Sequence, residues 1–325
     1  MTQRDAFWTR IYEIASEDRD VIVISADMGA SALDDFRKDI PGQFINVGIA
    51  EQNAIVIGSG LALSGKKVLV YAIAPFIALR CLEQVRVNNS MMKIPLTVVG
   101  VGAGFGYEDS GPTHHMLEDI TVMRAFPNVI LHGITDSVMA RAAADLTCTG
   151  EGTHYIRLDR QFLPSLYKEG DGFSDGLCVL KESSSGTFLV GTGVSTHMAL
   201  ALAAGLARQG RDVGVIDLYR LPVNEKGFAE TVKDAKLLIT LEEHFLPGGL
   251  GGAVCEALQD SGLLIPVKRF GLGHQDGYCY VYGGRDVIRG YYGFAESQLL
   301  EKVGALLRRY PGETPRLKFP MWSGK

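Results

Sequence analysis

Short runs rich in β-branched residues recur along this chain of 325 residues, and they constrain its fold more than any other feature. In the first half these runs cover residues 21–25, 68–72, 96–101, 129–131 and 155–158. They do not alternate with polar residues, which is typical of strands that are buried on both faces of a parallel sheet. Stretches with helical spacing lie between them, at residues 51–63 and 76–90. The pattern therefore predicts a parallel sheet covered by helices.

The same alternation starts again after residue 186, with candidate strands at residues 187–190, 213–217, 237–241 and 265–270. A helix is predicted over residues 197–209, with Ser195 or Thr196 capping its start and Gly210 just past its end. A polar, glycine-rich stretch at residues 167–185 separates the two halves. We expect two doubly wound α/β domains, a first at residues 1–166 and a smaller second at residues 186–325, joined by this linker.

Composition and charge exclude several classes of partner. The formal net charge is −5 and no basic tract stands out, which argues against nucleic acid. The N-terminus has no apolar signal core, and the longest apolar run, residues 68–79, is too short to span a membrane. The cysteines are scattered and never form a CxxC pair, so we expect reduced thiols in a cytoplasmic protein and no metal site of the chain's own. They are Cys81, Cys148, Cys178, Cys255 and Cys279.

One glycine-rich segment imitates a nucleotide-binding motif. Residues 191–196, GTGVST, follow a predicted strand and open a predicted helix, and Asp217 ends the next strand. A dinucleotide fingerprint has the same layout, but Thr196 stands where its third glycine belongs. We therefore do not assign a nucleotide site to this segment.

Three polar segments of the first half do not fit simple core packing. They are VGIAEQN at residues 47–53, GPTHH at residues 111–115 with residues 118–128 after it, and YIRLDR at residues 155–160. Their order and spacing resemble those of the transketolase family, specifically its pyrimidine-binding domain followed by its C-terminal domain. SADMGAS at residues 25–31, GGLGGAV at 248–254 and YGGR at 282–285 extend the resemblance over nearly the whole chain. The resemblance implies a thiamine diphosphate enzyme that transfers a two-carbon ketol unit from a ketose to an aldehyde.

Glu51 is the first candidate catalytic residue. It lies in sequence among Ile49, Ala50, Ala54 and Ile55, and partial burial there would favour its protonated form. A protonated carboxyl group can hydrogen-bond a ring nitrogen. In the family the matching glutamate does so toward the aminopyrimidine of thiamine diphosphate, and this promotes the imino tautomer that deprotonates the thiazolium carbon. The alternative is an acid placed at a helix start by the helix dipole.

The resemblance also assigns substrate residues. His114 matches the family's GPTH histidine, which faces the substrate and is catalytic, while His115 is interpreted as structural. Arg160 matches the arginine that binds the far, usually phosphorylated end of the sugar, and Ser31 matches a serine near that phosphate. For Arg157 and Arg160 the alternative is a surface salt bridge, and Arg160 is the preferred candidate.

An aromatic residue is expected to stack on the pyrimidine ring. Phe76 is the aromatic residue next to the position where the family has its stacking residue. Straight counting from Glu51, however, places Ile77 at that position. A shift of one residue near Pro75 restores Phe76. Core packing is the alternative role for Phe76, so both Phe76 and Ile77 stay candidates for the cofactor site.

Two departures from the family pattern concern the substrate. Ser110 stands immediately before GPTH, where the family has an acidic residue that senses the hydroxyl stereochemistry of the donor, and Asp109 comes one residue earlier. Gly102 stands where transketolases of the pentose phosphate pathway place a phosphate-binding histidine. Fewer phosphate ligands predict a variant sugar, with another anionic group or a bulkier one.

The chain lacks a motif for the cofactor's diphosphate. The family motif runs from Gly-Asp-Gly to an asparagine about thirty residues later and holds the diphosphate through a divalent cation with oxygen ligands. Gly170-Asp171-Gly172 lies in the predicted linker and residues 190–205 contain no asparagine, so we interpret the triplet as a turn. We expect an N-terminal transketolase subunit to hold most of the ligands of Mg²⁺ or Ca²⁺. This chain would be the C-terminal half of a split transketolase and, as a homodimer, the core of an α2β2 tetramer.

Three other functions remain open at this point. The β subunit of a thiamine-dependent 2-oxoacid dehydrogenase shares the two-domain layout but typically lacks GPTH and the Glu-Gln pair. A reaction like that of 1-deoxyxylulose-phosphate synthase would use pyruvate. A non-catalytic interaction subunit is disfavoured by the presence of Glu51, His114 and Arg160. No catalytic residue is assigned to the second domain, and residues 242–244, EEH, are interpreted as a structural cluster at a strand end.

Overall fold

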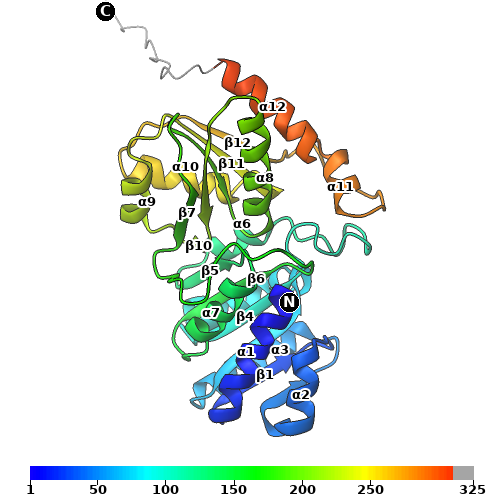
Figure 1. The fold of residues 1–325 in the computed structure, drawn as a ribbon. Coiled ribbons are helices and arrows are strands. Elements are labelled where there is room, and N and C mark those ends of the chain that lie inside the picture. Colours follow the sequence, from blue (N-terminus) through cyan, green and yellow to red (C-terminus); the bar gives the residue numbers. More distant parts are fainter. Residues whose placement is uncertain (310–325) are drawn as a thin grey trace, which may run out of the picture.

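The computed structural model describes residues 1–309 and contains two mostly parallel sheets, each flanked by helices (Figure 1). The first half contains α1 (Gln3–Glu17), β1 (Val21–Ser25), α2 (Ser31–Asp39), η1 (Pro41–Gln43), β2 (Phe44–Asn46), α3 (Glu51–Leu63), β3 (Lys67–Ile73), α4 (Ala74–Ala78), α5 (Leu82–Gln84), η2 (Val85–Met91), β4 (Leu96–Val101), α6 (Asp119–Arg124), β5 (Val129–Gly133), α7 (Ser137–Thr147) and β6 (Thr153–Leu158). The first sheet has the strand order β10-β5-β6-β4-β3-β1-β2. The predicted fold class is confirmed.

The second half builds the other sheet, with the strand order β12-β11-β8-β9-β7. It contains β7 (Leu177–Lys181), β8 (Thr187–Gly191), α8 (Val194–Arg208), β9 (Gly214–Leu218), β10 (Arg220–Leu221), α9 (Glu225–Val232), β11 (Leu237–Phe245), α10 (Leu250–Asp260), β12 (Val267–Leu272), α11 (Arg285–Tyr291) and α12 (Glu296–Arg309). No helix among residues 1–309 combines the length and apolar character needed to cross a membrane.

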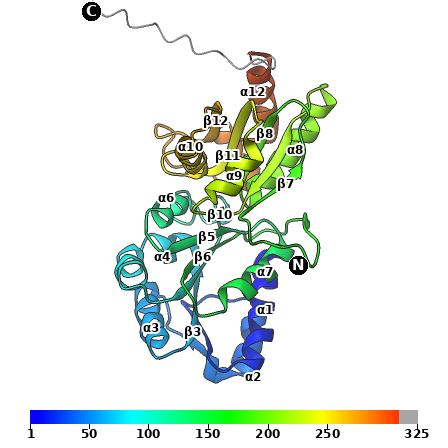
Figure 2. The same ribbon diagram turned by 90° about the vertical axis from the view of Figure 1, so that its left-hand side faces the viewer.

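Both faces of the first sheet are buried, as its mainly apolar strands predict. Along β1, Val21 and Val23 pack in the same cluster as residues of α1, α2 and α7, while Ile22 and Ile24 pack with residues of α3, α4 and α6. Figure 2 shows these two sets of helices on opposite sides of the strands. Since successive side chains of a strand point to opposite faces, β1 has apolar residues at consecutive positions.

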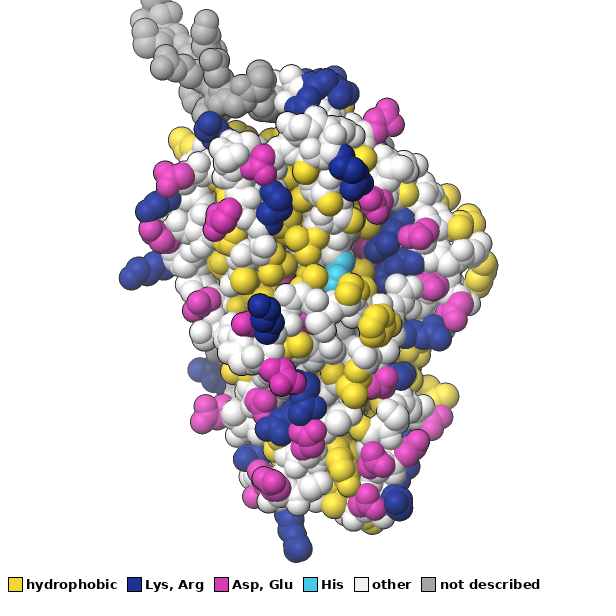
Figure 3. Space-filling view, viewed as in Figure 1, with side chains coloured by type: hydrophobic (Ala, Val, Ile, Leu, Met, Phe, Trp, Pro, Cys, Tyr) yellow, Lys and Arg dark blue, Asp and Glu magenta, His cyan; other side chains and the backbone are white. Residues whose placement is uncertain are grey.

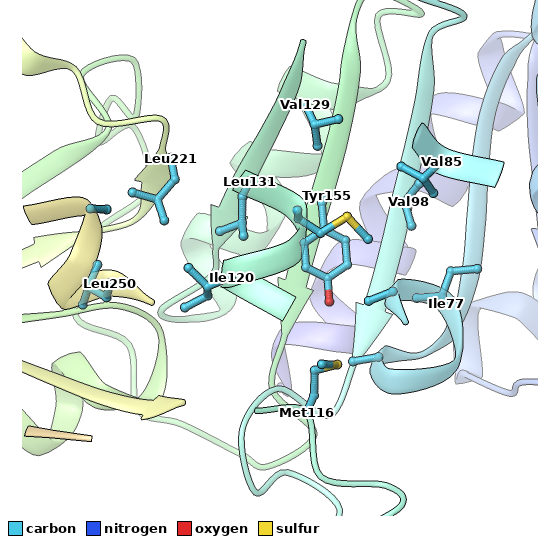
Figure 4. Close-up of a cluster of buried hydrophobic side chains, with 14 of the residues drawn as sticks. Ile77, Val85, Val98, Met116, Ile120, Val129, Leu131, Tyr155, Leu221 and Leu250 are labelled. Carbon is cyan, nitrogen blue, oxygen red and sulfur yellow. The ribbon is translucent and has the colours of Figure 1, made fainter. Parts of the chain in front are cut away.

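A shared apolar cluster joins the two halves of the chain. Leu221 of β10 and Leu250 of α10 belong to the same cluster as Leu131 and Ile120 of the first half. In Figure 4 these side chains face one another across the boundary.

On the molecular surface seen in Figure 3, basic and acidic side chains are interspersed.

Two strands run against the expected parallel direction. β7 pairs antiparallel with β9 at the edge of the second sheet, and β10 pairs antiparallel with β5 of the first. β7 lies inside the stretch 167–185, so this expected linker contains regular structure. The division of the chain at residues 166 and 186 stays a prediction. An edge strand of five half-buried residues gives a weaker pattern than a central strand, which is why the sequence did not reveal β7.

The helix predicted over residues 76–90 is wrong as a single element. The chain instead forms the short α4, a break, α5 and the π-helical η2. Arg80 lies in the break, and its carbonyl oxygen accepts a hydrogen bond from Gln52 Nε2 at 3.0 Å. The contact with α3 holds the backbone at Arg80, and helical spacing in the sequence carries no information about it.

The predicted cap of the first helix in the second half is also wrong. α8 begins at Val194, and its N-cap is Gly193, whose φ of 57° suits glycine. Ser195 and Thr196 lie within its first turn, and the Thr196 hydroxyl donates to Asp217 Oδ1 at 2.7 Å. Gly210 does lie just past the end of the helix, as predicted.

The surroundings of Asp217 explain why residues 191–196, which have the layout of a nucleotide-binding motif, do not form a nucleotide site. Its carboxylate is fully buried and accepts hydrogen bonds from the hydroxyls of Thr135, Thr196 and Tyr167. Burial raises the pKa of Asp217 to about 6, although these hydrogen bonds counteract part of the rise. The carboxylate is therefore occupied by internal partners and is not available to a ribose.

Candidate active site

Glu51 begins α3 and is almost completely buried, with 3% of its surface exposed. The sequence suggested purely apolar surroundings for Glu51. The structure differs, because Arg80 Nη1 lies 2.6 Å from Glu51 Oε2. Ile49, one of the expected apolar neighbours, is exposed. Glu51 is buried at the start of α3, and its positively charged partner, Arg80, comes from the break after α4. The carboxylate is thus paired with a cation and not isolated among apolar groups.

Phe76 and Ile77 lie on different sides of α4. Ile77 is fully buried in the core, whereas Phe76 is only half-buried. The Arg80 guanidinium carbon lies 4.5 Å from the centre of the Phe76 ring, and the ring centre of His114 lies 5.1 Å away. Of the two candidates, the geometry favours Phe76, which contacts both His114 and the arginine that pairs with Glu51.

His114 lies in the loop that follows β4. Thr113 Oγ1 lies 3.0 Å from His114 Nδ1, so one ring nitrogen has a hydrogen-bond partner within the turn. The ring centre of Tyr107, from the same loop, lies 6.0 Å from that of His114. A proline-containing turn and a hydroxyl partner restrict the orientation of the imidazole.

Arg160 follows β6 and reaches the same loop. Its guanidinium carbon lies 4.9 Å from the centre of the Tyr107 ring, and its Nη1 lies 2.9 Å from Asp109 Oδ1. Ser110 Oγ donates to the same carboxylate oxygen at 3.0 Å. Arg160 and Asp109 are both substantially exposed, so a ligand can reach them.

These contacts join most of the predicted site residues into one series, which we call the site series. It runs through Glu51, Arg80, Phe76, His114, Tyr107, Arg160, Asp109 and Ser110. Ser31 is exposed at the start of α2, and among residues 1–309 no hydrogen bond connects it to the series. Ile77 lies in the core. The sequence missed Arg80 and Tyr107; the only signal for Arg80 was a lone cation in an otherwise apolar stretch.

Arg157, three residues before Arg160, has a different environment. It is buried, and its Nε lies 2.8 Å from Asp119 Oδ2, which also accepts a hydrogen bond from the Tyr155 hydroxyl. Burial opposes ionisation of Arg157, but the Asp119 carboxylate outweighs it and the pKa of Arg157 is raised. The preference for Arg160 over Arg157 as the ligand-facing arginine agrees with this geometry.

His115 is buried, and its ring contacts a side chain outside the site series. Its ring packs edge-on against Phe105, with ring centres 5.6 Å apart, and burial lowers its pKa. Phe105 in turn stacks on Tyr292 of the second half, with ring centres 5.5 Å apart. His115 therefore packs in the contact between the two halves, which fits its structural interpretation.

The second half holds the loop that carries His114. Arg285 Nη2 lies 2.7 Å from both Asp159 Oδ2 and Glu243 Oε2, and Glu243 accepts a hydrogen bond from the backbone N–H of Phe105. Burial alone would raise the pKa of Glu243, but Arg285 and Arg289 outweigh it and hold this pKa well below its ordinary range. The predicted structural cluster at residues 242–244 and the YGGR segment thus meet in one buried ion network.

Glu242 connects this cluster to the glycine-rich segment of the second half. Its two carboxylate oxygens accept hydrogen bonds from the backbone N–H groups of Leu250 and Gly251, at the start of α10. A carboxylate at a helix start is stabilised by the free N–H groups there. The two conspicuous motifs of the second half therefore serve structure in this chain.

Comparison with known proteins agrees with this layout. A family model described as "Transketolase, pyrimidine binding domain" matches residues 1–165, and one described as "Transketolase, C-terminal domain" matches residues 176–282. One subunit of an apulose-4-phosphate transketolase from Phocaeicola vulgatus is 33% identical over 294 residues, covering 89% of this chain and 92% of that protein. A 6-deoxy-6-sulfo-D-fructose transketolase subunit from a Clostridium species is 30% identical over 271 residues, covering 83% of this chain and 84% of that protein.

A solved structure has the same architecture. It is described as a split gene transketolase in an inactive beta4 tetramer. It superimposes with a TM-score of 0.82 at 30% sequence identity, covering 95% of this chain and 98% of that one.

Proposed function

Because the chain belongs to the transketolase family, as the C-terminal half of a split enzyme, we propose that it transfers a two-carbon ketol unit from a ketose to an aldehyde together with an N-terminal subunit. One observation carries the proposal. The site series joins Glu51, the residue expected to meet the cofactor, to Arg160, the residue expected to meet the distal end of a sugar.

The residues of the first domain fit the pyrimidine end of thiamine diphosphate. Glu51 offers a buried carboxylate at a helix start, and Phe76 offers a half-exposed ring beside it. The bound cofactor would supply the carbon nucleophile for cleaving and forming the carbon–carbon bond. Glu51 would hold or share a proton at a pyrimidine nitrogen, and Phe76 would provide the stacking face.

His114 and Arg160 would bind the two ends of the sugar. His114 has one ring nitrogen beside Thr113, which leaves the other to hydrogen-bond a substrate oxygen near the reacting carbons. Arg160 provides a planar guanidinium for a distal anion, and Asp109 and Ser110 fix its position. Two relatives are named for sugars that carry a phosphate or a sulfonate. We propose that the substrate carries a distal anion of this kind on a variant sugar that differs from the standard pentose phosphates.

The missing part of the site motivates a partner subunit. Among residues 1–309 no group of three or more His, Cys, Asp or Glu side chains is arranged to hold a metal ion. We propose that the N-terminal subunit brings most ligands of Mg²⁺ or Ca²⁺ and of the diphosphate. All five cysteines are free, which supports a cytoplasmic location.

An exposed apolar surface supports assembly of this chain with a second copy. Ile49, Val56 and Leu63 recur every seven residues at and along α3, and all three are exposed, as are Met91 and Met92 at the end of the adjoining η2. Large exposed apolar side chains gathered on one surface are typical of protein interfaces. We propose that two copies meet there as the core of an α2β2 tetramer.

The test is a reconstitution of two-carbon transfer. The chain is purified with and without the product of a neighbouring gene that carries Gly-Asp-Gly and a downstream asparagine, and is assayed with thiamine diphosphate and Mg²⁺. We expect activity only in the mixture. Activity of this chain alone would refute the split arrangement. Turnover restricted to pyruvate and other 2-oxoacids that lack a C3 hydroxyl group would move the protein to the dehydrogenase or decarboxylating branch.

A further inference from the structure

We propose that Tyr107 is a specificity residue whose ring forms the wall along which the sugar's carbon chain lies between His114 and Arg160. The inference rests on the proposed function and deepens it. Tyr107 matches no motif and was not a candidate from the sequence; it emerges from the position of its ring in the site series.

The Tyr107 ring has a defined position because it packs on glycine. Gly102, at the end of β4, has a φ of +92°, and a Cβ atom built there would lie 2.1 Å from Tyr107 Cδ2 and 2.3 Å from Cε2. No side chain fits in that space while the ring is present. Gly102 and Tyr107 therefore form a matched pair, in which the tyrosine ring occupies the volume that a residue at position 102 would otherwise fill.

The ring is adjacent to both residues that are proposed to bind the ends of the sugar. Its centre is 6.0 Å from the ring centre of His114 and 4.9 Å from the guanidinium carbon of Arg160. A sugar that reaches from one to the other has to pass the ring. Burial raises the pKa of Tyr107, so the wall is neutral: it offers an aromatic face and a hydroxyl group, and no charge.

The chemistry of this wall limits the substrate. Arg160 is the guanidinium proposed for the distal anion, and it already shares its charge with Asp109. The carbon atoms next to that anion meet an aromatic face, which favours C–H surface over densely hydroxylated carbon. The substrate class is therefore a sugar with a distal phosphate or sulfonate and an apolar face toward that end.

The experiment uses the assembled enzyme with hydroxypyruvate as donor and compares two kinds of acceptor. Glycolaldehyde is too short to reach Arg160, whereas glyceraldehyde 3-phosphate, erythrose 4-phosphate and ribose 5-phosphate carry a distal anion. In Tyr107→Ala we expect kcat/KM for the best phosphorylated acceptor to fall about tenfold, mainly through KM, because an aromatic contact is lost. For glycolaldehyde we expect a change of less than about twofold.

Two further variants make the result specific. Tyr107→Phe keeps the ring and loses only the hydroxyl, so it should retain the acceptor preference of the native enzyme. Tyr291→Ala removes an exposed tyrosine of α11 and serves as the control, with both acceptors unaffected. Isothermal titration of the same phosphorylated acceptor should show the loss of affinity in Tyr107→Ala independently of turnover.

The outcomes separate this inference from the proposed function. Equal losses for both acceptors in Tyr107→Ala, or no loss for either, would overturn the role of Tyr107 while two-carbon transfer stands. A native enzyme that transfers no two-carbon unit and binds none of these acceptors would overturn the proposed function, and the role of Tyr107 with it.

Discussion

Glu51 and Glu243 look alike by burial and by their ion pairs, yet their surroundings differ. Both are almost completely buried, at 3% and 2% exposure, and each has an arginine nitrogen within 2.7 Å. The partner of Glu51, Arg80, has 43% of its side chain exposed, while Arg285 beside Glu243 has 4%. A carboxylate whose paired arginine reaches solvent can exchange that arginine for a ligand. The exposure of the partner therefore distinguishes a site from a structural pair better than burial of the acid does.

The largest effect that follows from this comparison concerns Glu51. In Glu51→Gln we expect the assembled enzyme to lose at least about 100-fold in kcat, since an amide cannot share a proton as a carboxyl group does. The side chains have nearly the same shape, so the melting temperature should stay close to that of the native chain. Steady-state assays and thermal unfolding measure the two quantities.

The matched control for Glu51 is Glu83→Gln, which alters an exposed glutamate on the nearby α5. It should leave both kcat and the melting temperature unchanged. If Glu51→Gln retained full activity, Glu51 would be only an acid at a helix start, with a structural role like that of Glu243.

The second prediction concerns stability. Arg285→Met leaves Glu243 and Asp159 buried with fewer positive partners, so we expect the free energy of unfolding to fall by about 3–5 kcal/mol. Denaturant titration measures this loss. Arg86→Met, at an exposed arginine with a partner 4.0 Å away, should change it by less than about 1 kcal/mol. A loss that small in Arg285→Met would mean that the network does not hold the two halves together.

The same contrast shows what the sequence reveals and what it does not. The bounds of β1, β4 and α3 match the predicted ranges, because apolar periodicity reports burial directly. Arg80 and Tyr107 were missed because their roles depend on contacts far apart in the sequence, such as Gln52 with the Arg80 carbonyl. The sequence identified the residues that belong to family motifs. It could not identify Arg80 and Tyr107, because only the folded conformation of their loops places them beside those residues.

The third prediction is a pH dependence that separates the two glutamates. The pKa of Glu243 is held below its ordinary range in the folded chain. Its contribution to stability is therefore complete above the unfolded pKa of about 4.3 and is lost as the pH falls below that value. Glu243→Gln should flatten the decline of the unfolding free energy between about pH 5 and pH 3, measured by denaturant titration at each pH. An unchanged slope would assign the acid sensitivity to other carboxylates.

The smallest expected effect tests whether the partner of Glu51 can be exchanged. Arg80→Gln removes the guanidinium that pairs with Glu51 and covers the Phe76 ring. Because Arg80 is substantially exposed, water screens its attraction to Glu51, and we expect thiamine diphosphate to bind the assembled enzyme up to about fivefold more tightly in the variant. Calorimetric titration of the cofactor measures this directly, with Arg86→Gln as the exposed control. Weaker binding in Arg80→Gln would show that Arg80 helps to hold the cofactor and does not compete with it, so that the Glu51 pair, like that of Glu243, is a permanent one.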